Sequence, residues 1–208
     1  MRGSRGYHLK NFGLIFVLLL LTSCSGQTEN SDATIHRAKL DEFEGNLLSL
    51  ITQHDLVYDL KIKNHDIRAV MTTIDYYKNG QFVQQLSQLR APLLEEEIKK
   101  DLKLVIFNQS INETQESWTS SFMAGSNNAS VTIKNDISGR EKRNFSSVSG
   151  GRDKATLTID KSKVIATIAY SNKNELYIID EIDSEEDIKE ATKYEHVYII
   201  SVELKNEQ

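Results

Sequence analysis

Apolar and polar residues alternate along most of the chain beyond residue 55, which is the pattern of half-buried β-strands. The clearest runs are residues 56–62 and 70–76. The dipeptide Asn79-Gly80 is typical of a tight hairpin, so residues 81–89 are expected to pair back on the strand before them. Further strands, all rich in β-branched or aromatic residues, are predicted at 103–109, 116–123, 129–135, 155–159, 164–170, 175–180 and 196–204.

Two segments have a helical pattern instead. Between residues 35 and 51, apolar residues recur at spacings of three and four with charges between them, which predicts one amphipathic helix. Gly45 inside it costs about 1 kcal/mol relative to alanine. Residues 184–193 begin with Ser184 and three acidic residues, which is the capping chemistry of a helix start.

Many short strands separated by Gly, Asn or Ser clusters predict a mainly β fold. We expect an antiparallel β-sandwich or barrel-like domain that follows an N-terminal amphipathic helix and carries a short helix near the C-terminus. The clusters at 125–128 and 149–151 are expected to be turns, and the acidic stretch at 95–97 a connector. A length of 208 residues fits one domain, which we place at residues 35–208.

The first 24 residues follow a different plan. Three basic residues among the first ten precede an apolar run at residues 12–21, the layout of an export signal. The run is about ten residues long, whereas a membrane-spanning helix needs about twenty. The tetrapeptide Leu21-Thr22-Ser23-Cys24 follows, and Cys24 is the single cysteine of the chain.

This tetrapeptide resembles the lipobox of bacterial lipoproteins, in which a branched apolar residue and two small residues precede an invariant cysteine. The resemblance implies that residues 1–23 are a signal peptide cut between Ser23 and Cys24, and that the Cys24 thiol receives a diacylglyceryl group. Residues 24–34 would then form a flexible tether below a domain on the extracytoplasmic face of the cell membrane. The alternative is an ordinary secretory signal with a chance cysteine, which would leave an exported thiol open to oxidation.

A second resemblance covers about a third of the chain. Residues 76–89, with Tyr-Tyr-Lys-Asn-Gly before an apolar alternation, and residues 180–204 are similar to strands in small uncharacterised lipoproteins of Gram-positive bacteria. This resemblance implies no activity.

The charge balance excludes nucleic acid as a partner. The chain has 25 basic and 30 acidic residues, and three of the basic ones, Arg2, Arg5 and Lys10, lie in the export signal. The remainder has 22 basic and 30 acidic residues, a balance of −8, whereas a nucleic-acid partner requires a basic face.

No residue pattern indicates catalysis or a cofactor. His36, His54, His65 and His196 lack metal-site spacing, and we expect them on the surface or in loops. The carboxylates between residues 180 and 187 are numerous enough for calcium, but they lack the EF-hand order, and acidic residues before a helix are favoured by its dipole. We therefore expect no metal site, no cofactor and no enzyme.

The expected function is contact: a binding or assembly module that is fixed to the membrane through lipid on Cys24 and meets a protein partner at the cell surface. A small-ligand-binding lipoprotein is the alternative, and a hydrolase the third. Contact requires an exposed apolar patch, whereas a ligand receptor or an enzyme requires a concave pocket with converging polar groups.

Overall fold

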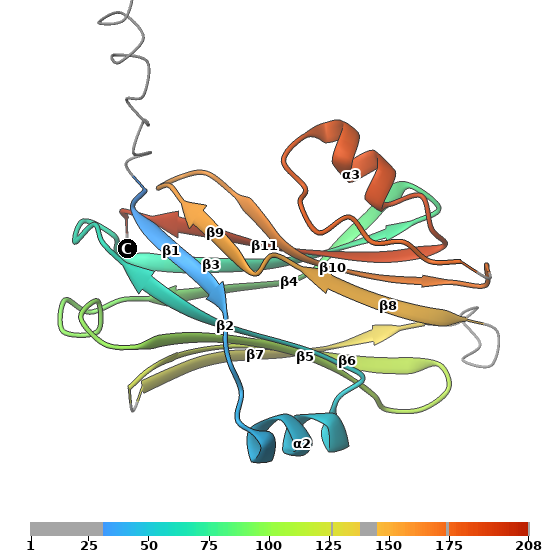
Figure 1. Cartoon of the computed structure of the whole chain (residues 1–208), viewed down its shortest axis with the longest axis horizontal. Helices are drawn as coiled ribbons and strands as arrows, with labels where there is room; N and C mark the ends of the chain where they lie inside the picture. Colours follow the sequence, from blue (N-terminus) through green and yellow to red (C-terminus); the bar gives the residue numbers. More distant parts are fainter. Residues whose placement is uncertain (1–30, 126, 138–144, 174, 208) are drawn as a thin grey trace, which may run out of the picture. The chain divides into compact units, whose positions relative to one another are not determined.

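The computed structural model describes residues 31–125, 127–137, 145–173 and 175–207. Residues 31–208 form one compact unit. The described strands lie in two antiparallel sheets that face each other across a common core, with two short helices outside them (Figure 1). The prediction of a mainly β, antiparallel sandwich-like domain with two helices is confirmed.

One sheet has six strands in the order β7-β6-β5-β2-β1-β9. Its strands are β1 (Ala33–Arg37), β2 (His54–Ile62), β5 (Leu102–Ser110), β6 (Gln115–Ala124), β7 (Asn127–Asp136) and β9 (Lys154–Leu157). The short strand β1 is hydrogen-bonded on both sides, because Ile35 is opposite Leu60 of β2 and also opposite Ala155 of β9.

The other sheet has five strands in the order β4-β3-β11-β10-β8. Its strands are β3 (Ala69–Lys78), β4 (Gln81–Pro92), β8 (Ser146–Gly151), β10 (Lys163–Ser171) and β11 (His196–Lys205). Asn79 and Gly80 have φ values of 50° and 80°, the left-handed geometry of a tight β-hairpin, and Lys78 is opposite Gln81. The predicted hairpin is confirmed.

The two sheets meet along both edges. The chain passes from β8 of the five-stranded sheet to β9 of the six-stranded sheet within residues 151–154, and β4 packs against β6 and β7 on the other side. The core between the sheets is formed by inward-facing apolar residues, among them Leu56, Ile74, Ile106, Trp118 and Ile200. The period-two pattern of residues 56–62 and 70–76 therefore placed Leu56 and Ile74 correctly.

Helix α2 (Glu42–Ile51) is the predicted N-terminal helix, but it is shorter than expected. Asp41 caps it, since its carboxylate accepts a hydrogen bond from the Glu44 backbone at 2.8 Å and the Glu44 carboxylate accepts one from the Asp41 backbone at 3.0 Å. The prediction that the helix begins at residue 35 is wrong. Ile35 fits the two-residue period of a strand as well as the period of a helix. The strand forms because β1 pairs with β2 on one side and with β9 on the other.

Helix α3 (Glu185–Ala191) confirms the second helix. Ser184 and Asp187 form a capping box at its start. Residues 175–180, predicted as a strand, belong to no strand. Instead this segment covers the outer face of the five-stranded sheet, where Leu176 and Ile188 pack against buried Val197 and Ile199.

The Ser-Gly-Gly stretch at 149–151, predicted as a turn, lies within β8. Glycine is required there because other residues pass very close to the strand. A Cβ added at Gly150 would lie 2.1 Å from Ile178 Cγ2, and one added at Gly151 would lie 2.5 Å from the Tyr58 hydroxyl oxygen. These glycines allow close packing rather than chain reversal.

Candidate functional site

The predicted lipidation and cleavage residues, Cys24 and Ser23, lie outside the residues that the structure describes. Their roles stay predictions. Among the described helices, none has the length and apolar character needed to cross a membrane.

The four histidines fall into two groups. His36 and His65 lie near the surface on the end of the domain where β1 begins, whereas His54 and His196 lie at the opposite end of their sheets. His196 is buried and its Nδ1 lies 2.6 Å from the Tyr76 hydroxyl oxygen. The prediction that all four are surface or loop residues is therefore wrong for His196, because the five-stranded sheet places its side chain inward.

The acidic residues between 180 and 187 have structural roles. The Asp183 carboxylate accepts hydrogen bonds from Lys163 and Arg152, which lower the pKa of Asp183, and it lies 2.7 Å from the Arg152 guanidinium. Asp187 belongs to the α3 capping box, and hydrogen bonds from the backbone of Asp183 and the side chain of Ser184 lower its pKa. Within the described ranges, no group of three or more His, Cys, Asp or Glu residues is placed to hold a metal ion.

A buried polar cluster connects the two sheets around Glu116 of β6. Its carboxylate oxygen Oε1 accepts hydrogen bonds from Trp118 Nε1 at 3.0 Å, from Asn135 Nδ2 at 3.1 Å and from the Tyr198 hydroxyl at 2.6 Å. Tyr198 belongs to β11, so the last bond joins the six-stranded sheet to the five-stranded one. Nearby, Asn108 of β5 donates to the Tyr170 hydroxyl of β10 at 3.0 Å, another bond between the sheets.

Aromatic rings fill the space around this cluster. Trp118 and Tyr198 lie 4.6 Å apart between ring centroids, and Tyr198 stacks on Tyr76 at 5.1 Å. Such pairs stabilise a core beyond the area that they bury. Sequence reasoning missed the polar members, although Glu116 and Trp118 are two residues apart and so must share the inward face of β6. We interpret this cluster as a polar cross-link of the core.

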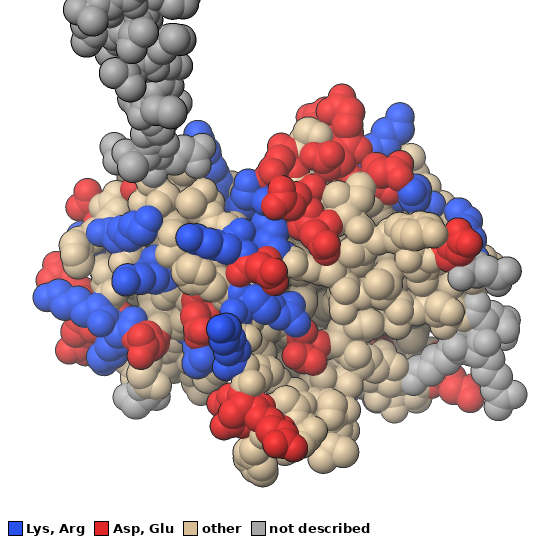
Figure 2. Space-filling model, in the orientation of Figure 1, with Lys and Arg blue, Asp and Glu red and all other residues tan. Residues whose placement is uncertain are grey.

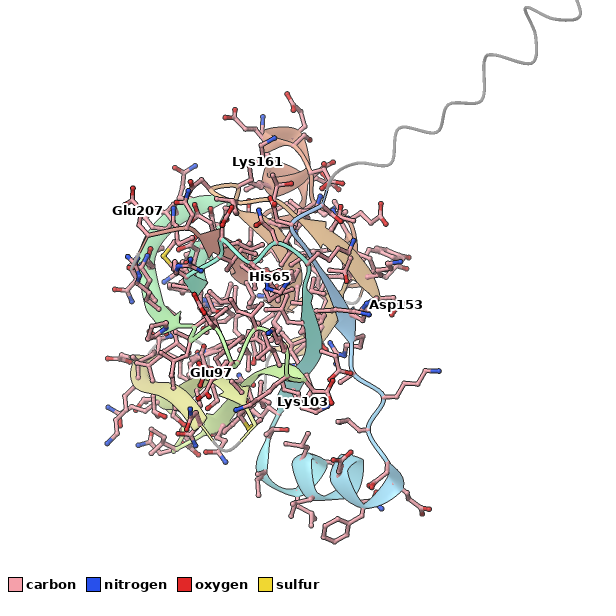
Figure 3. All side chains as sticks on the ribbon, turned by 90° about the vertical axis from the view of Figure 1, so that its left-hand side faces the viewer. His65, Glu97, Lys103, Asp153, Lys161 and Glu207 are labelled. Carbon is pink, nitrogen blue, oxygen red and sulfur yellow. The ribbon has the colours of Figure 1, made fainter. Side chains whose placement is uncertain are left out.

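A surface groove with a volume of about 670 Å³ opens where β2 ends and β5 begins. We call it the lysine groove. Its charged and titratable lining residues are His36, Asp59, Lys61, His65, Lys99, Lys100, Asp101 and Lys103. Figure 3 looks onto this end of the domain, with His65 and Lys103 labelled on it.

The connector from β4 to β5 forms one wall of the lysine groove and is held by Glu97. The buried Glu97 carboxylate accepts hydrogen bonds from the Leu94 backbone at 2.9 Å and from Asn127 Nδ2 at 2.6 Å. These two bonds, the backbone bond first, lower the pKa of Glu97, so the carboxylate stays ionised at neutral pH. The two lysines that follow, Lys99 and Lys100, are thereby held at the groove while their side chains remain exposed.

Helix α2 carries an exposed apolar face. Phe43, Leu47, Leu50 and Ile51 recur at helical spacing and share one side of the helix. The exposed fractions reach 74% for Phe43 and 81% for Leu50, and no residue of α2 is buried. Ile111, also exposed, lines a shallow pocket with Leu50 and Ile51. We call these five residues the α2 patch.

Charge is distributed unevenly around these surfaces. Figure 2 shows lysines and arginines gathered on the side where β1 begins, and acidic residues over α2 and α3. The acidic residues at the start of α2 are Asp41, Glu42 and Glu44, next to the α2 patch. The domain thus has a basic end, on the side where β1 begins, and an outer helix, α2, that is acidic at its start and apolar along one face.

Comparison with known proteins gives one match. A family model described as YgaN domain matches residues 34–204. No curated protein and no solved structure matches the chain. The matched range includes all but the first residue of β1, both described helices and all but the last residue of β11.

Proposed function

The chain belongs to the YgaN domain family, and we propose that it is a lipid-anchored extracytoplasmic protein that binds a partner protein through the α2 patch. The lipobox-like tetrapeptide ending at Cys24 supports the anchor. The observation that carries the contact function is the exposed apolar face of α2, because a protein that acts by contact needs such a patch.

The energetics of α2 favour a partner. A ten-residue helix is marginal by itself in water, and α2 has no buried residue that would fix it to the domain. Burying one large apolar side chain contributes about 1.5–3 kcal/mol, so a partner that covered Phe43, Leu47 and Leu50 would gain several kcal/mol. The capping box at Asp41 keeps the helix formed in advance, which lowers the cost of ordering it on binding.

The charges beside the α2 patch indicate the kind of partner. Asp41, Glu42 and Glu44 surround the start of the helix, and α2 has no basic residue in its last turn. A complementary surface is an apolar groove with basic residues at its rim, the helix-in-groove mode of recognition. The same acidic residues disfavour insertion of α2 into an anionic bilayer.

The alternative of a small-ligand-binding lipoprotein has one observation in its favour, the lysine groove. That groove lies at the surface, and its lysines do not converge on an enclosed space. A receptor for a small ligand encloses most of its ligand, so we favour partner contact.

The contact function is tested by photocrosslinking in intact cells. A photoreactive amino acid replaces Leu50 in one strain and Leu94, which is 53% exposed on the β4–β5 connector, in the control strain. We expect a discrete adduct from position 50 that is absent from position 94 and is lost when Phe43→Asp is added. Equal adducts from both positions, or none from position 50, would contradict the proposal.

The anchor is tested separately with Cys24→Ser. We expect the variant to lose incorporation of labelled fatty acid and to leave the membrane fraction, because two acyl chains hold a protein stably whereas a bare chain is released. A variant that takes up as much label and stays with membranes would overturn the lipid anchor.

A further inference from the structure

We propose that the lysine groove contacts the anionic phosphate headgroups of the bilayer to which the chain is anchored, so that this end of the domain faces the membrane. The inference rests on the proposed function for the position of the anchor. It adds a second membrane contact, with a defined orientation, and it leaves the α2 patch for a protein partner.

The position of the groove along the chain supports this. Ala33 at the start of β1 is opposite Ile62 of β2, and Ile62 lines the groove. Ser31 accepts a hydrogen bond from Lys63 at 2.6 Å. Six residues lie between Cys24 and Ser31, and the seven chain steps from Cys24 to Ser31 span at most about 25 Å when fully extended. An acylated Cys24 therefore keeps the groove close to the headgroups.

The charge of the groove is opposite to that of the domain. Its lining includes four lysines against two aspartates, whereas acidic residues outnumber basic ones beyond the export signal. Lys103 is paired with Asp59 at 2.7 Å. Lys61, Lys99 and Lys100 are exposed, and in the described part of the chain none of them forms an ion pair. These three can meet phosphates without first breaking a salt bridge.

The charges on the rest of the surface favour one orientation of the domain on the membrane. Figure 2 shows acidic residues over α3 and α2, whereas lysines and arginines gather on the side where β1 begins. An anionic bilayer attracts the groove and repels both helices. The attraction acts within about 8 Å at physiological ionic strength, a distance that the short link to Cys24 makes reachable.

The experiment uses the acylated full chain in vesicles of phosphatidylcholine, with or without phosphatidylglycerol. With Cys24 acylated, a new cysteine is the only free thiol and carries one fluorescent label. Leu94→Cys places the label on the β4–β5 connector, whose residues 98–100 line the groove, and Leu50→Cys places it on α2. A headgroup-linked quencher in the bilayer reports which label lies nearer to the surface.

We expect phosphatidylglycerol to increase quenching at position 94 and not at position 50. The variant with Lys61→Gln, Lys99→Gln and Lys100→Gln should lose this increase. Each lysine near an anionic surface changes the partition about fivefold, so three change it about a hundredfold. The control, Lys134→Gln with Lys173→Gln and Lys189→Gln, removes the same charge elsewhere and should keep it.

The groove contact would be overturned if quenching at position 94 did not change with phosphatidylglycerol. It would also be overturned if the increase in quenching fell equally in both triple variants. If inorganic phosphate without vesicles raises the thermal midpoint of the native chain but not of the groove variant, the site serves a free anion instead. A full chain that, as purified, carries no acyl group on Cys24 and stays off phosphatidylcholine vesicles contradicts the anchor alone. The groove contact is then still tested by whether binding to phosphatidylglycerol vesicles depends on Lys61, Lys99 and Lys100.

Discussion

Replacement of Gly151 by alanine is expected to destabilise the domain by forcing apart two residues that now touch across its core. A Cβ at position 151 would lie 2.5 Å from the Tyr58 hydroxyl oxygen and 3.1 Å from the Ile165 carbonyl oxygen. Tyr58 is buried and donates a hydrogen bond to that same carbonyl at 2.9 Å. Burial raises the pKa of Tyr58, so the hydroxyl keeps its proton and remains a donor at neutral pH.

The size of the effect follows from two costs. Forcing a methyl group into a packed site costs about 1–3 kcal/mol, and displacing a buried hydroxyl from its partner costs about 1–3 kcal/mol more. We expect Gly151→Ala to lower the free energy of unfolding by about 2–6 kcal/mol. For a domain of this length, that lowers the melting temperature by about 4–24 °C.

A double-mutant cycle with Tyr58→Phe assigns the cost to this contact. Tyr58→Phe alone should cost about 1 kcal/mol, because the Ile165 carbonyl still accepts a bond from the Arg152 backbone at 2.9 Å. In that background the oxygen that the new methyl group would meet is gone, so Gly151→Ala should cost at least about 1 kcal/mol less than in the native chain.

The measurement is urea unfolding of residues 31–208, followed by the fluorescence of Trp118, the single tryptophan of the chain and a buried one. A loss that is the same with tyrosine or phenylalanine at position 58 would refute the reasoning, because the two sites would then act independently.

Three further outcomes are expected. Gly45→Ala should stabilise the domain by up to about 1 kcal/mol, since the added Cβ meets nothing within 4 Å in helix α2, and urea unfolding measures this. Hydrogen bonds, from Lys163 first and then from Arg152, lower the pKa of Asp183. The contribution of Asp183 to stability is therefore present above the ordinary aspartate pKa of 3.8 and is lost as the pH falls through the pKa of the folded state. The melting temperature should fall less steeply with acidification in Asp183→Asn than in the native chain. Calcium should leave the melting temperature unchanged, since Asp183 already engages basic residues; a calcium-dependent rise would reveal a metal site.

The sequence predicted the strands best where one face of a strand is buried and the other is not. Residues 56–62 and 70–76 alternate because each strand contributes one side to the core, and the Asn79-Gly80 hairpin follows from the left-handed backbone that its turn needs. These signals are local, so a single sequence reveals them.

The errors arose where a distant residue decides the local structure. Gly150 and Gly151 have the sequence pattern of a turn. No residue near them in the sequence indicates that Ile178 and Tyr58 will lie in close contact with this strand. The role of Glu116 likewise depends on Tyr198, which is 82 residues away. The periodicity of α2 predicted an amphipathic helix, but not that its apolar side would lie in solvent.

Strand β1 has a mechanical consequence. A force applied to the chain ahead of Ser31 is passed to the five residues of β1, all of which pair with β2 and four of which also pair with β9. Two ladders must shear together before the strand comes free, so tension at that terminus is shared across the six-stranded sheet. A protein anchored by its amino terminus would therefore resist unfolding from the anchored end.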